Sequence, residues 1–280
     1  MIKKLNLFII FYILFYTPVS IMATPKITPV ISYLLSDESW YKPDINTTWQ
    51  WQLTGDINTA YDVDLYDIDL FDSSEALIRS LHNDSRKVIC YFSAGSYEDW
   101  RNDSESFPDT VKGKKMDGWD ELWLDISNDS LKAIMIARLD LAKTKGCDGV
   151  EPDNMDGYTN DTGFNLTSQH QLNYNKFIAI EARKRGLSVG LKNDVNQIYE
   201  LEPFFDFAVN EQCHEFNECE NMQLFIDANK PVFNAEYQVK YRDNTDGARD
   251  EICSRKSSKN FQILILPKNL DDNFISIGCD

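Results

Sequence analysis

Short, near-continuous apolar runs recur along the chain and alternate with longer stretches that show helical periodicity. Apolar runs of this kind are typical of parallel strands that are covered on both faces. The alternation therefore predicts repeated strand–helix units and argues against a β-sandwich. The expected strands occupy residues 48–53, 62–68, 87–93, 121–126, 147–152, 187–192, 205–210, 231–236 and 261–266.

Two of the intervening stretches carry clear helix signals. The first places four residues on one helical face, at spacings of four, four and three: Leu131, Met135, Leu139 and Ala142. Residues 128–130 can cap this helix, and Gly146 ends it. Ser168 and Gln171 have the spacing of a capping box and predict a second helix that ends at Gly186.

The number of strands favours a (β/α)8 barrel, because eight or nine strands over roughly 230 residues match the usual size of that fold. If residues 62–68 form the first barrel strand, then 261–266 form the eighth and 48–53 are an extra N-terminal element, which is the count we prefer. If 48–53 are the first strand, the last strand is extra. A doubly wound sheet is the alternative fold, but the glycine-rich nucleotide loop that usually accompanies it is missing.

The N-terminus has the pattern of a secretory signal peptide. Lys3 and Lys4 precede an apolar stretch, and Ala23 offers a small residue for cleavage, so residues 1–23 are expected to be removed. An uncleaved anchor is the alternative. Residues 24–47 are expected to be a leader and 48–280 the barrel domain. The sequence therefore predicts a secreted, extracellular protein that has no membrane contact after cleavage.

Six cysteines fit an oxidising compartment. Cys213 and Cys219 are a natural local pair, and Cys253 with Cys279 could hold the C-terminus. Cys90 and Cys147 pair or stay buried as thiols. Zinc at Cys213, His214 and Cys219 is an alternative, but the sequence has no second cluster at ligand spacing. N-glycosylation is expected at six sequons: Asn46, Asn83, Asn102, Asn128, Asn160 and Asn165.

Charge narrows the class of partner. The chain carries 45 Asp and Glu against 28 Lys and Arg, a formal net charge of −17 at pH 7. Nucleic acid and anionic lipid both require basic protein surface, so neither is an expected partner. Neutral or cationic molecules remain. Hydrophobic residues make up 42% of the chain, enough for a folded core.

Carboxylates gather where the expected strands end, which is the catalytic face of a barrel. Glu151, Asp153 and Glu211 follow apolar strand cores directly, and Lys192 closes another strand. Ser96 has no convincing His partner, and no metalloprotease or calcium-loop motif has the right spacing. Paired carboxylates at such a face suit glycoside hydrolysis, and no metal site is predicted.

Aromatic residues supply the second half of a sugar site, because flat rings stack on the apolar faces of sugars. They make up 12% of the chain. Tyr91, Trp100 and Tyr158 are the rings near strand ends that most favour this use, and Tyr237 follows the strand at 231–236.

Several long motifs occur in one order: WQWQLTGD, DVDLYDIDLFD, KVICYFSAGSYEDWR, GCDGVEPDNMDGY, GLSVGLKND, AVNEQC and KPVFNAEY. They resemble glycoside hydrolase family 114, the endo-α-1,4-polygalactosaminidase-like barrel proteins, over residues 45 to 270. The resemblance implies a (β/α)8 barrel that cuts α-1,4-linked galactosamine polymers without a cofactor. Its partner would be a cationic or neutral amino-sugar polysaccharide.

The resemblance also assigns roles. Asp153 and Glu211 match the catalytic carboxylates, with Asp153 taken as nucleophile and Glu211 as acid/base, although the two could be exchanged. The residues expected to bind substrate are Asp69, Tyr91, Trp100, Glu151, Asn154, Tyr158, Lys192, Asn193, Glu236 and Tyr237. A sugar-binding barrel without activity and a glycosidase or transglycosylase on another amino sugar are the alternatives.

Overall fold

The parallel strands form one sheet. The computed structural model describes residues 40–279, in which nine strands are hydrogen-bonded in the order β1-β2-β3-β7-β8-β9-β10-β11-β12. All neighbours from β1 to β11 are parallel, and β12 runs antiparallel to β11. The strands are β1 (Trp49–Gln52), β2 (Leu65–Asp69), β3 (Lys87–Ser93), β7 (Gly149–Asp153), β8 (Ser188–Lys192), β9 (Phe207–Glu211), β10 (Val232–Glu236), β11 (Gln262–Ile265) and β12 (Ile277–Gly278).

The sheet is curled, and its two faces belong to two separate apolar clusters. Residues of β1 and β11 share the inner cluster, which includes Trp49, Phe233 and Leu264. The outer cluster joins alternate strand residues to the helices, as at Val88 and Ile263. Because side chains alternate along a strand, each strand is buried on both sides, which explains the near-continuous apolar runs.

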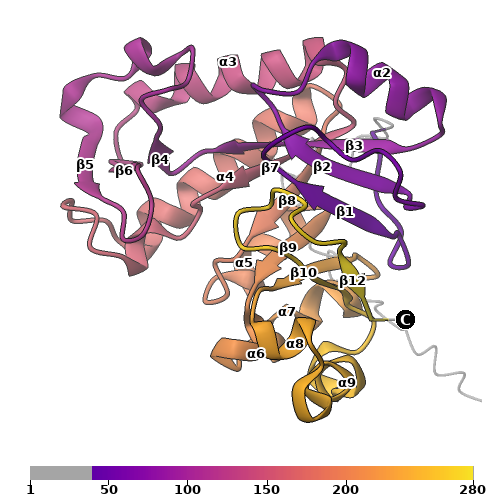
Figure 1. Cartoon of the computed structure of the whole chain (residues 1–280). Coiled ribbons are helices and arrows are strands. Elements are labelled where there is room, and N and C mark those ends of the chain that lie inside the picture. Colours follow the sequence, from indigo (N-terminus) through magenta and orange to yellow (C-terminus); the bar gives the residue numbers. More distant parts are fainter. Residues whose placement is uncertain (1–39, 280) are drawn as a thin grey trace, which may run out of the picture. The chain divides into compact units, whose positions relative to one another are not determined.

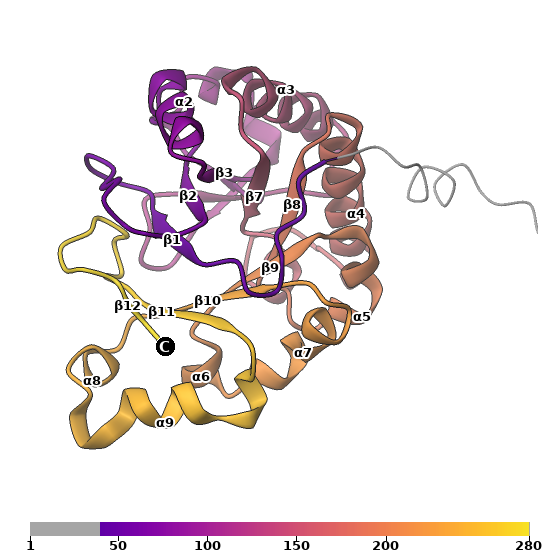
Figure 2. The same ribbon diagram turned by 90° about the vertical axis from the view of Figure 1, so that its right-hand side faces the viewer.

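The helices lie outside the curve of the sheet, and Figure 2 shows α2, α3 and α4 along it. Within residues 40–279 the α-helices are α2 (Glu75–Asn83), α3 (Ser130–Lys145), α4 (Ser168–Lys184), α5 (Ile198–Leu201), α6 (Cys213–Phe216), α7 (Cys219–Asp227), α8 (Val239–Arg242) and α9 (Ala248–Ser254). The strand order follows the chain order, unlike that of a doubly wound sheet, so the alternative fold is excluded.

Helices α3 and α4 confirm the sequence signals, with one shift. The predicted stripe of α3 is buried, and Gly146 ends it with φ 90°, a left-handed conformation that suits glycine. The capping box of α4 lies one residue earlier than predicted. Thr167 accepts from the backbone of His170, whose ring accepts from the Thr167 N–H, and Gly186 follows the helix with φ 68°.

The preferred strand count was wrong. Residues 48–53 are not an extra element, because β1 pairs in parallel with β2 and belongs to the main sheet. The extra segment is 121–126, whose β6 (Leu122–Leu124) pairs with β4 (Ser96–Tyr97) and β5 (Lys112–Lys115) in a small antiparallel sheet. This sheet lies in the long segment that follows β3, residues 94–129, which we call the excursion between β3 and β7. Figure 1 draws it on the left. Eight parallel strands remain, although not the predicted eight.

The two ends of the parallel sheet contact each other through side chains. Trp49 Nε1 donates to the backbone oxygen of Gln262 at 2.9 Å. Among the described residues no backbone ladder joins β1 to β11. The observed architecture is therefore a curled parallel sheet wrapped by helices.

Three disulfides are present: the two predicted pairs and the Cys90–Cys147 pair, which the sequence left open. Cys90 of β3 is bonded to Cys147 before β7, and both residues are buried in the outer cluster. Cys213–Cys219 closes a short loop after β9, in which the two cysteines are six positions apart. Cys253–Cys279 ties α9 to the C-terminal segment. The Cys90–Cys147 pair, which could also have remained as thiols, is thereby settled.

The expected signal peptide and most of the leader fall outside the described residues. The end of the leader packs on the domain that follows it, because the Ile45 carbonyl oxygen accepts a hydrogen bond from the Gln262 side chain at 3.2 Å. Among residues 40–279, no helix combines the length and apolar character that a membrane crossing needs. All the sequon asparagines except the half-buried Asn128 are exposed, and their glycosylation stays a prediction.

Candidate active site

Charged side chains replace apolar ones at the carboxyl ends of the parallel strands. Glu151 and Asp153 project inward from β7, Lys192 from β8 and Glu211 from β9. Each occupies a position that continues the inward-facing series of its strand. Neighbouring parallel strands thus bring residues that are distant in sequence to one place.

Lys192 is the centre of this group. Its Nζ lies 3.1 Å from Glu151 Oε1, 3.1 Å from Asp153 Oδ1 and 3.2 Å from Glu211 Oε2. Trp51 of β1 presents its ring to the same nitrogen, 4.6 Å from the ring centroid. Burial alone would lower the pKa of Lys192, but Asp153, Glu151 and Glu211 outweigh it and raise that pKa well above its usual value. The lysine is therefore a permanent cation.

A fourth carboxyl, Asp67, lies close to Glu151. Both are buried completely, and burial raises the pKa of Glu151 to about 7 although Lys192 opposes it. Burial, followed by the charge of Glu151, raises the pKa of Asp67 well above its usual range. Asp67 therefore keeps its proton near neutral pH. A protonated Asp67 limits the negative charge near Lys192.

Asp153 accepts hydrogen bonds from three sides. The Tyr91 hydroxyl donates to Oδ2 at 3.0 Å, the Asn154 backbone N–H donates to Oδ1 at 2.7 Å, and Lys192 provides the third contact. Asn154 has φ 60°, and its side chain donates to Ser93 Oγ at 2.9 Å. A Cβ at Gly95 would lie 1.8 Å from the Asn154 carbonyl oxygen, so only glycine allows this close approach.

Glu211 has its own set of donors. The Tyr237 hydroxyl donates to Oε1 at 2.5 Å, and Asn193 Nδ2 lies 3.4 Å from Oε2. Asn193 also accepts from the Glu211 backbone N–H at 2.9 Å, which fixes the loop after β8 to the end of β9. The side chains of Asp153 and Glu211 are 19% and 28% exposed, whereas Glu151 is fully buried, so the first two are the carboxylates that a ligand can reach.

Both carboxylates open into a cavity of about 510 Å³. Its outer wall comes from the excursion between β3 and β7, which contributes the half-exposed indoles of Trp100 and Trp119. Acidic side chains outnumber basic ones in the lining. The acids are Asp69, Asp72, Glu98, Asp120, Glu121, Asp153, Asp156 and Glu211, and the bases are Arg101, Lys192 and Lys268.

Arg101 organises the acids of that wall. It binds Asp69 through two nitrogens at 2.6 and 3.0 Å, and its Nε donates to Glu98 at 2.8 Å. All three side chains are nearly buried. Asp69 also accepts from the backbone N–H groups of Phe71 and Asp72. Its oxygens are thus engaged within the protein, which indicates a role in building the wall.

Nine of the twelve predicted site residues line this cavity: Asp69, Tyr91, Trp100, Asp153, Asn154, Lys192, Asn193, Glu211 and Tyr237. Glu151 lies beneath it and supports Lys192. Tyr158 and Glu236 are outside its lining. Glu236 follows Ala235 on β10 and precedes Tyr237, both of which face inward, so alternation turns Glu236 to the helix side. There its Oε1 accepts from the His214 backbone N–H at 2.9 Å.

Several lining residues were not predicted, above all Arg101, Glu98 and Glu121. They belong to loops or to the small sheet, where no periodicity indicates a direction. The one sequence signal for these residues was the spacing of Glu98 and Arg101, because two opposite charges three positions apart can form an ion pair. Burial raises the pKa of Glu121 to about 7, and Ser96 donates to that carboxyl.

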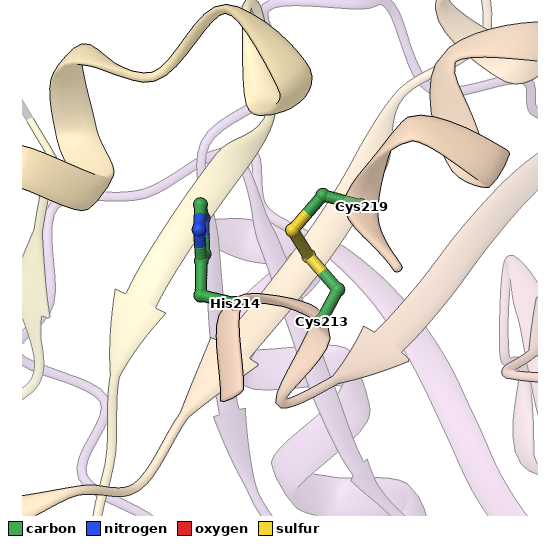
Figure 3. Close-up of side chains that lie close together, drawn as sticks. All are labelled: Cys213, His214 and Cys219. Atoms are coloured by element: carbon green, nitrogen blue, oxygen red, sulfur yellow. A yellow bond between two sulfur atoms is a disulfide. The ribbon is translucent and has the colours of Figure 1, made fainter. Parts of the chain in front are cut away.

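One cluster of potential metal ligands, Cys213, His214 and Cys219, occurs in the described part of the chain. Figure 3 shows that the two sulfurs form a disulfide beside the imidazole. Zinc binds thiolates, and neither sulfur is one here. Burial lowers the pKa of His214 to about 4, so its ring is neutral. The zinc alternative therefore has no support.

The sequence model of glycoside-hydrolase family GH114 matches residues 32–280. The chain belongs to this family. It is therefore a glycosidase, and its resemblance to the family, inferred from the motifs, is confirmed.

Among solved structures, the Aspergillus fumigatus protein Ega3 in complex with galactosamine is 40% identical, with a TM-score of 0.80. The match covers 85% of this GH114 chain and 97% of the Ega3 chain. The glycoside hydrolase domain of PelA from Pseudomonas aeruginosa shares the fold at 14% identity and a TM-score of 0.64, covering 82% and 97%. No curated protein sequence matches the chain.

Proposed function

We propose that this GH114 protein is an endo-acting hydrolase of α-1,4-linked galactosamine-containing polysaccharide, with Asp153 and Glu211 as its catalytic carboxylates. The carrying observation is that both acids reach the same cavity while one buried cation, Lys192, contacts them both. Two carboxyl groups at one sugar site are the requirement for glycoside hydrolysis by acid and nucleophile or base.

The surroundings support Asp153 as nucleophile. Tyr91, the Asn154 N–H and Lys192 all donate to it, an arrangement that suits a carboxylate that attacks the sugar carbon. Glu211 is the more exposed of the two and serves as acid/base. It protonates the glycosidic oxygen and then removes a proton from the incoming water.

The separation of the acids supports retention of configuration. Lys192 Nζ is 3.1 Å from one carboxylate oxygen and 3.2 Å from the other, so these oxygens are separated by at most the sum of both distances. That limit, which holds for the two oxygens bound to Lys192, accommodates the roughly 5–5.5 Å between the carboxyl groups of retaining enzymes. Asp153 would then form a covalent glycosyl intermediate.

The lining supports a cationic substrate. The lining of the cavity contains eight acidic residues and three basic ones, so it attracts an ammonium-bearing sugar and repels an anionic one. Trp100 and Trp119 offer ring faces on which sugars can stack. The related Ega3 was crystallised with galactosamine, which favours that sugar here as well.

Secretion and a complete (β/α)8 barrel belong to the same proposal. Three disulfides support an oxidising compartment, and residues 1–23 would direct the chain there. Eight parallel strands in sequential order, with β1 and β11 packed into one inner cluster, support the barrel.

The test is release of reducing ends by the purified protein from three polymers: galactosamine polymer, its fully N-acetylated form and a polyuronic acid. The proposal expects hydrolysis of the first, slower hydrolysis of the second and none of the third. Tight binding of galactosamine polymer without any release would instead support a sugar-binding barrel. Faster hydrolysis of a different amino-sugar polymer would move the substrate to that sugar.

A further inference from the structure

A second cavity, of about 320 Å³, lies beyond Glu211. Four residues line both this cavity and the larger one: Asp156, Asn193, Glu211 and Gln212. Asp153 lines the larger cavity but not the second one. The two cavities therefore adjoin at Glu211, and this shared residue is the proposed acid/base.

That asymmetry indicates which half of a substrate each cavity holds. The sugar that is attacked must touch the nucleophile and the acid, so it belongs in the larger cavity. The acid gives its proton to the oxygen of the departing sugar. A space that adjoins Glu211 and lies away from Asp153 is where that departing sugar would lie.

The second cavity contains an unused polar group. Asp194 is 3% exposed, and its Oδ2 accepts from Asn175 at 2.8 Å. Its Oδ1 accepts no hydrogen bond from any residue within 40–279, although the Tyr158 hydroxyl lies near enough to lower the pKa of this acid. A buried acceptor without a partner is costly, and a sugar hydroxyl or amine would satisfy it.

Phe216, at the end of α6, adds an apolar face to the same cavity. Phe216 is 62% exposed, so its ring is open to a ligand, and aromatic rings stack on the apolar faces of sugars. Glu218 follows it in the lining. Both lie between Cys213 and Cys219, so the disulfide of Figure 3 holds this wall in place before any ligand binds.

The charge of the lining suits one class of sugar. It contains four acids, Asp156, Asp194, Glu211 and Glu218, and none of its residues is a lysine or arginine. Burial, and next the charge of Asp156, raises the pKa of Asp194 to about 8, so this carboxyl can also donate to a sugar oxygen near neutral pH. A uronic acid would find no counter-charge here.

We propose that this second cavity binds the departing galactosamine unit, with Phe216 as its stacking platform and Asp194 as a hydrogen-bonding partner. The inference rests on the proposed function and extends it by assigning the direction in which the polymer lies across the two cavities. The polymer would run from the indoles of the excursion, past Asp153 and Glu211, to the Cys213–Cys219 loop. In the retaining reaction an acceptor sugar would bind at the same place.

The experiment compares two leaving groups. Galactosamine polymer has a sugar in the second cavity, whereas the 4-nitrophenyl glycoside of an α-galactosamine oligomer has only an aryl group there. Phe216→Ala should reduce kcat/KM for the polymer by roughly five- to tenfold, and for the aryl glycoside by less than about twofold. Phe216→Tyr keeps the ring and should restore the polymer rate.

The matched control is Tyr199→Ala, which removes an aromatic ring that is 82% exposed on α5, away from the cavity lining. It should leave the ratio of the two rates unchanged. Thermal melting of all three variants checks that each is folded. An equal loss on both substrates, or no loss on either, would overturn the assignment of the second cavity. If the wild type cleaved neither substrate, the proposed function itself would fail and this assignment with it.

Discussion

The inner side of the curled sheet changes from apolar to charged side chains within two residues along the strands. Leu65 of β2 and Val209 of β9 belong to a completely buried apolar core. Two residues further along the same strands, on the same side, are Asp67 and Glu211. The two halves of the interior share the same strands and the same curvature, and they differ in charge.

This difference shows what burial of charge requires. The apolar half is stabilised by contact alone, whereas each carboxylate of the charged half needs a donor or a proton. Lys192 supplies the positive charge, and the buried Asp67 keeps its own proton. The comparison predicts that changes in the apolar half reduce stability, whereas changes in the charged half reduce activity first.

Lys192→Met should have the largest effect, because it leaves three carboxylates without their common cation. We expect kcat/KM on galactosamine polymer to fall on the order of 10²–10³-fold and the free energy of unfolding to fall by about 3–5 kcal/mol. Rates and chemical denaturation measure both. The exposed Lys143→Met is the control, and a Lys192 variant that retained wild-type activity would remove the lysine from the account.

Phe233→Ala tests the apolar half. Its ring lies 4.9 Å from that of Trp49 and 5.6 Å from that of Phe207, and it is 1% exposed. Truncation should lower the free energy of unfolding by about 3–5 kcal/mol. The kcat of the protein that remains folded should change little. Ile275→Ala, at a residue that is 73% exposed, is the matched control. A large loss of kcat with unchanged stability would break the division between the two halves.

Glu151→Gln examines the boundary between the halves. The variant keeps the shape and an oxygen acceptor for Lys192, but it removes a negative charge below the site. We expect kcat to fall roughly tenfold, with the alkaline limb of the pH–rate profile moved to lower pH, because one charge fewer opposes ionisation of the acid/base. A profile that kept its shape would mean that Glu151 acts through packing alone.

Glu236 is a buried strand-end acid on the helix side of the sheet, where its Oε2 has no partner among the described residues. Burial raises its pKa to about 7. Its folded-state pKa lies above the unfolded value, so its contribution to stability is complete below about pH 4 and is lost as the pH rises through about 7.

The unfolding temperature should therefore fall between pH 5 and pH 8, and Glu236→Gln should reduce that fall by a few degrees, at roughly 2–4 °C for each kcal/mol. Differential scanning calorimetry at several pH values measures it. The exposed Glu220→Gln is the control for loss of a surface carboxylate. An unchanged slope in Glu236→Gln would show that the pKa of this acid is not raised in the folded state.

The fold could be predicted from the sequence because the strand–helix alternation is periodic. The error in the strand count has a physical cause, since residues 121–126 form a short apolar run that looks alike in a main sheet and in a small antiparallel one. Only the pairing partner distinguishes them, and pairing is not local. The β1 segment was predicted as an extra element for the same reason, because its pairing with β2 is not visible in the local sequence.

The site was predictable where it follows strands, as for Asp153 and Glu211, and less so where it follows loops. Arg101 and Trp119 lie in the excursion, where no period indicates direction. The placement of Glu236 could have been anticipated, because adjacent strand residues cannot both face inward and Tyr237 was also assigned to the site.

The central claim is that Asp153 is one of two carboxylates that perform the reaction. The direct measurement is release of reducing ends from galactosamine polymer by Asp153→Asn, which keeps the shape and the contact with Tyr91, with the surface variant Asp129→Asn as control. The account predicts a loss of about a thousandfold or more in kcat for Asp153→Asn, while the polymer is still bound. Activity of Asp153→Asn within about tenfold of the wild type would contradict it.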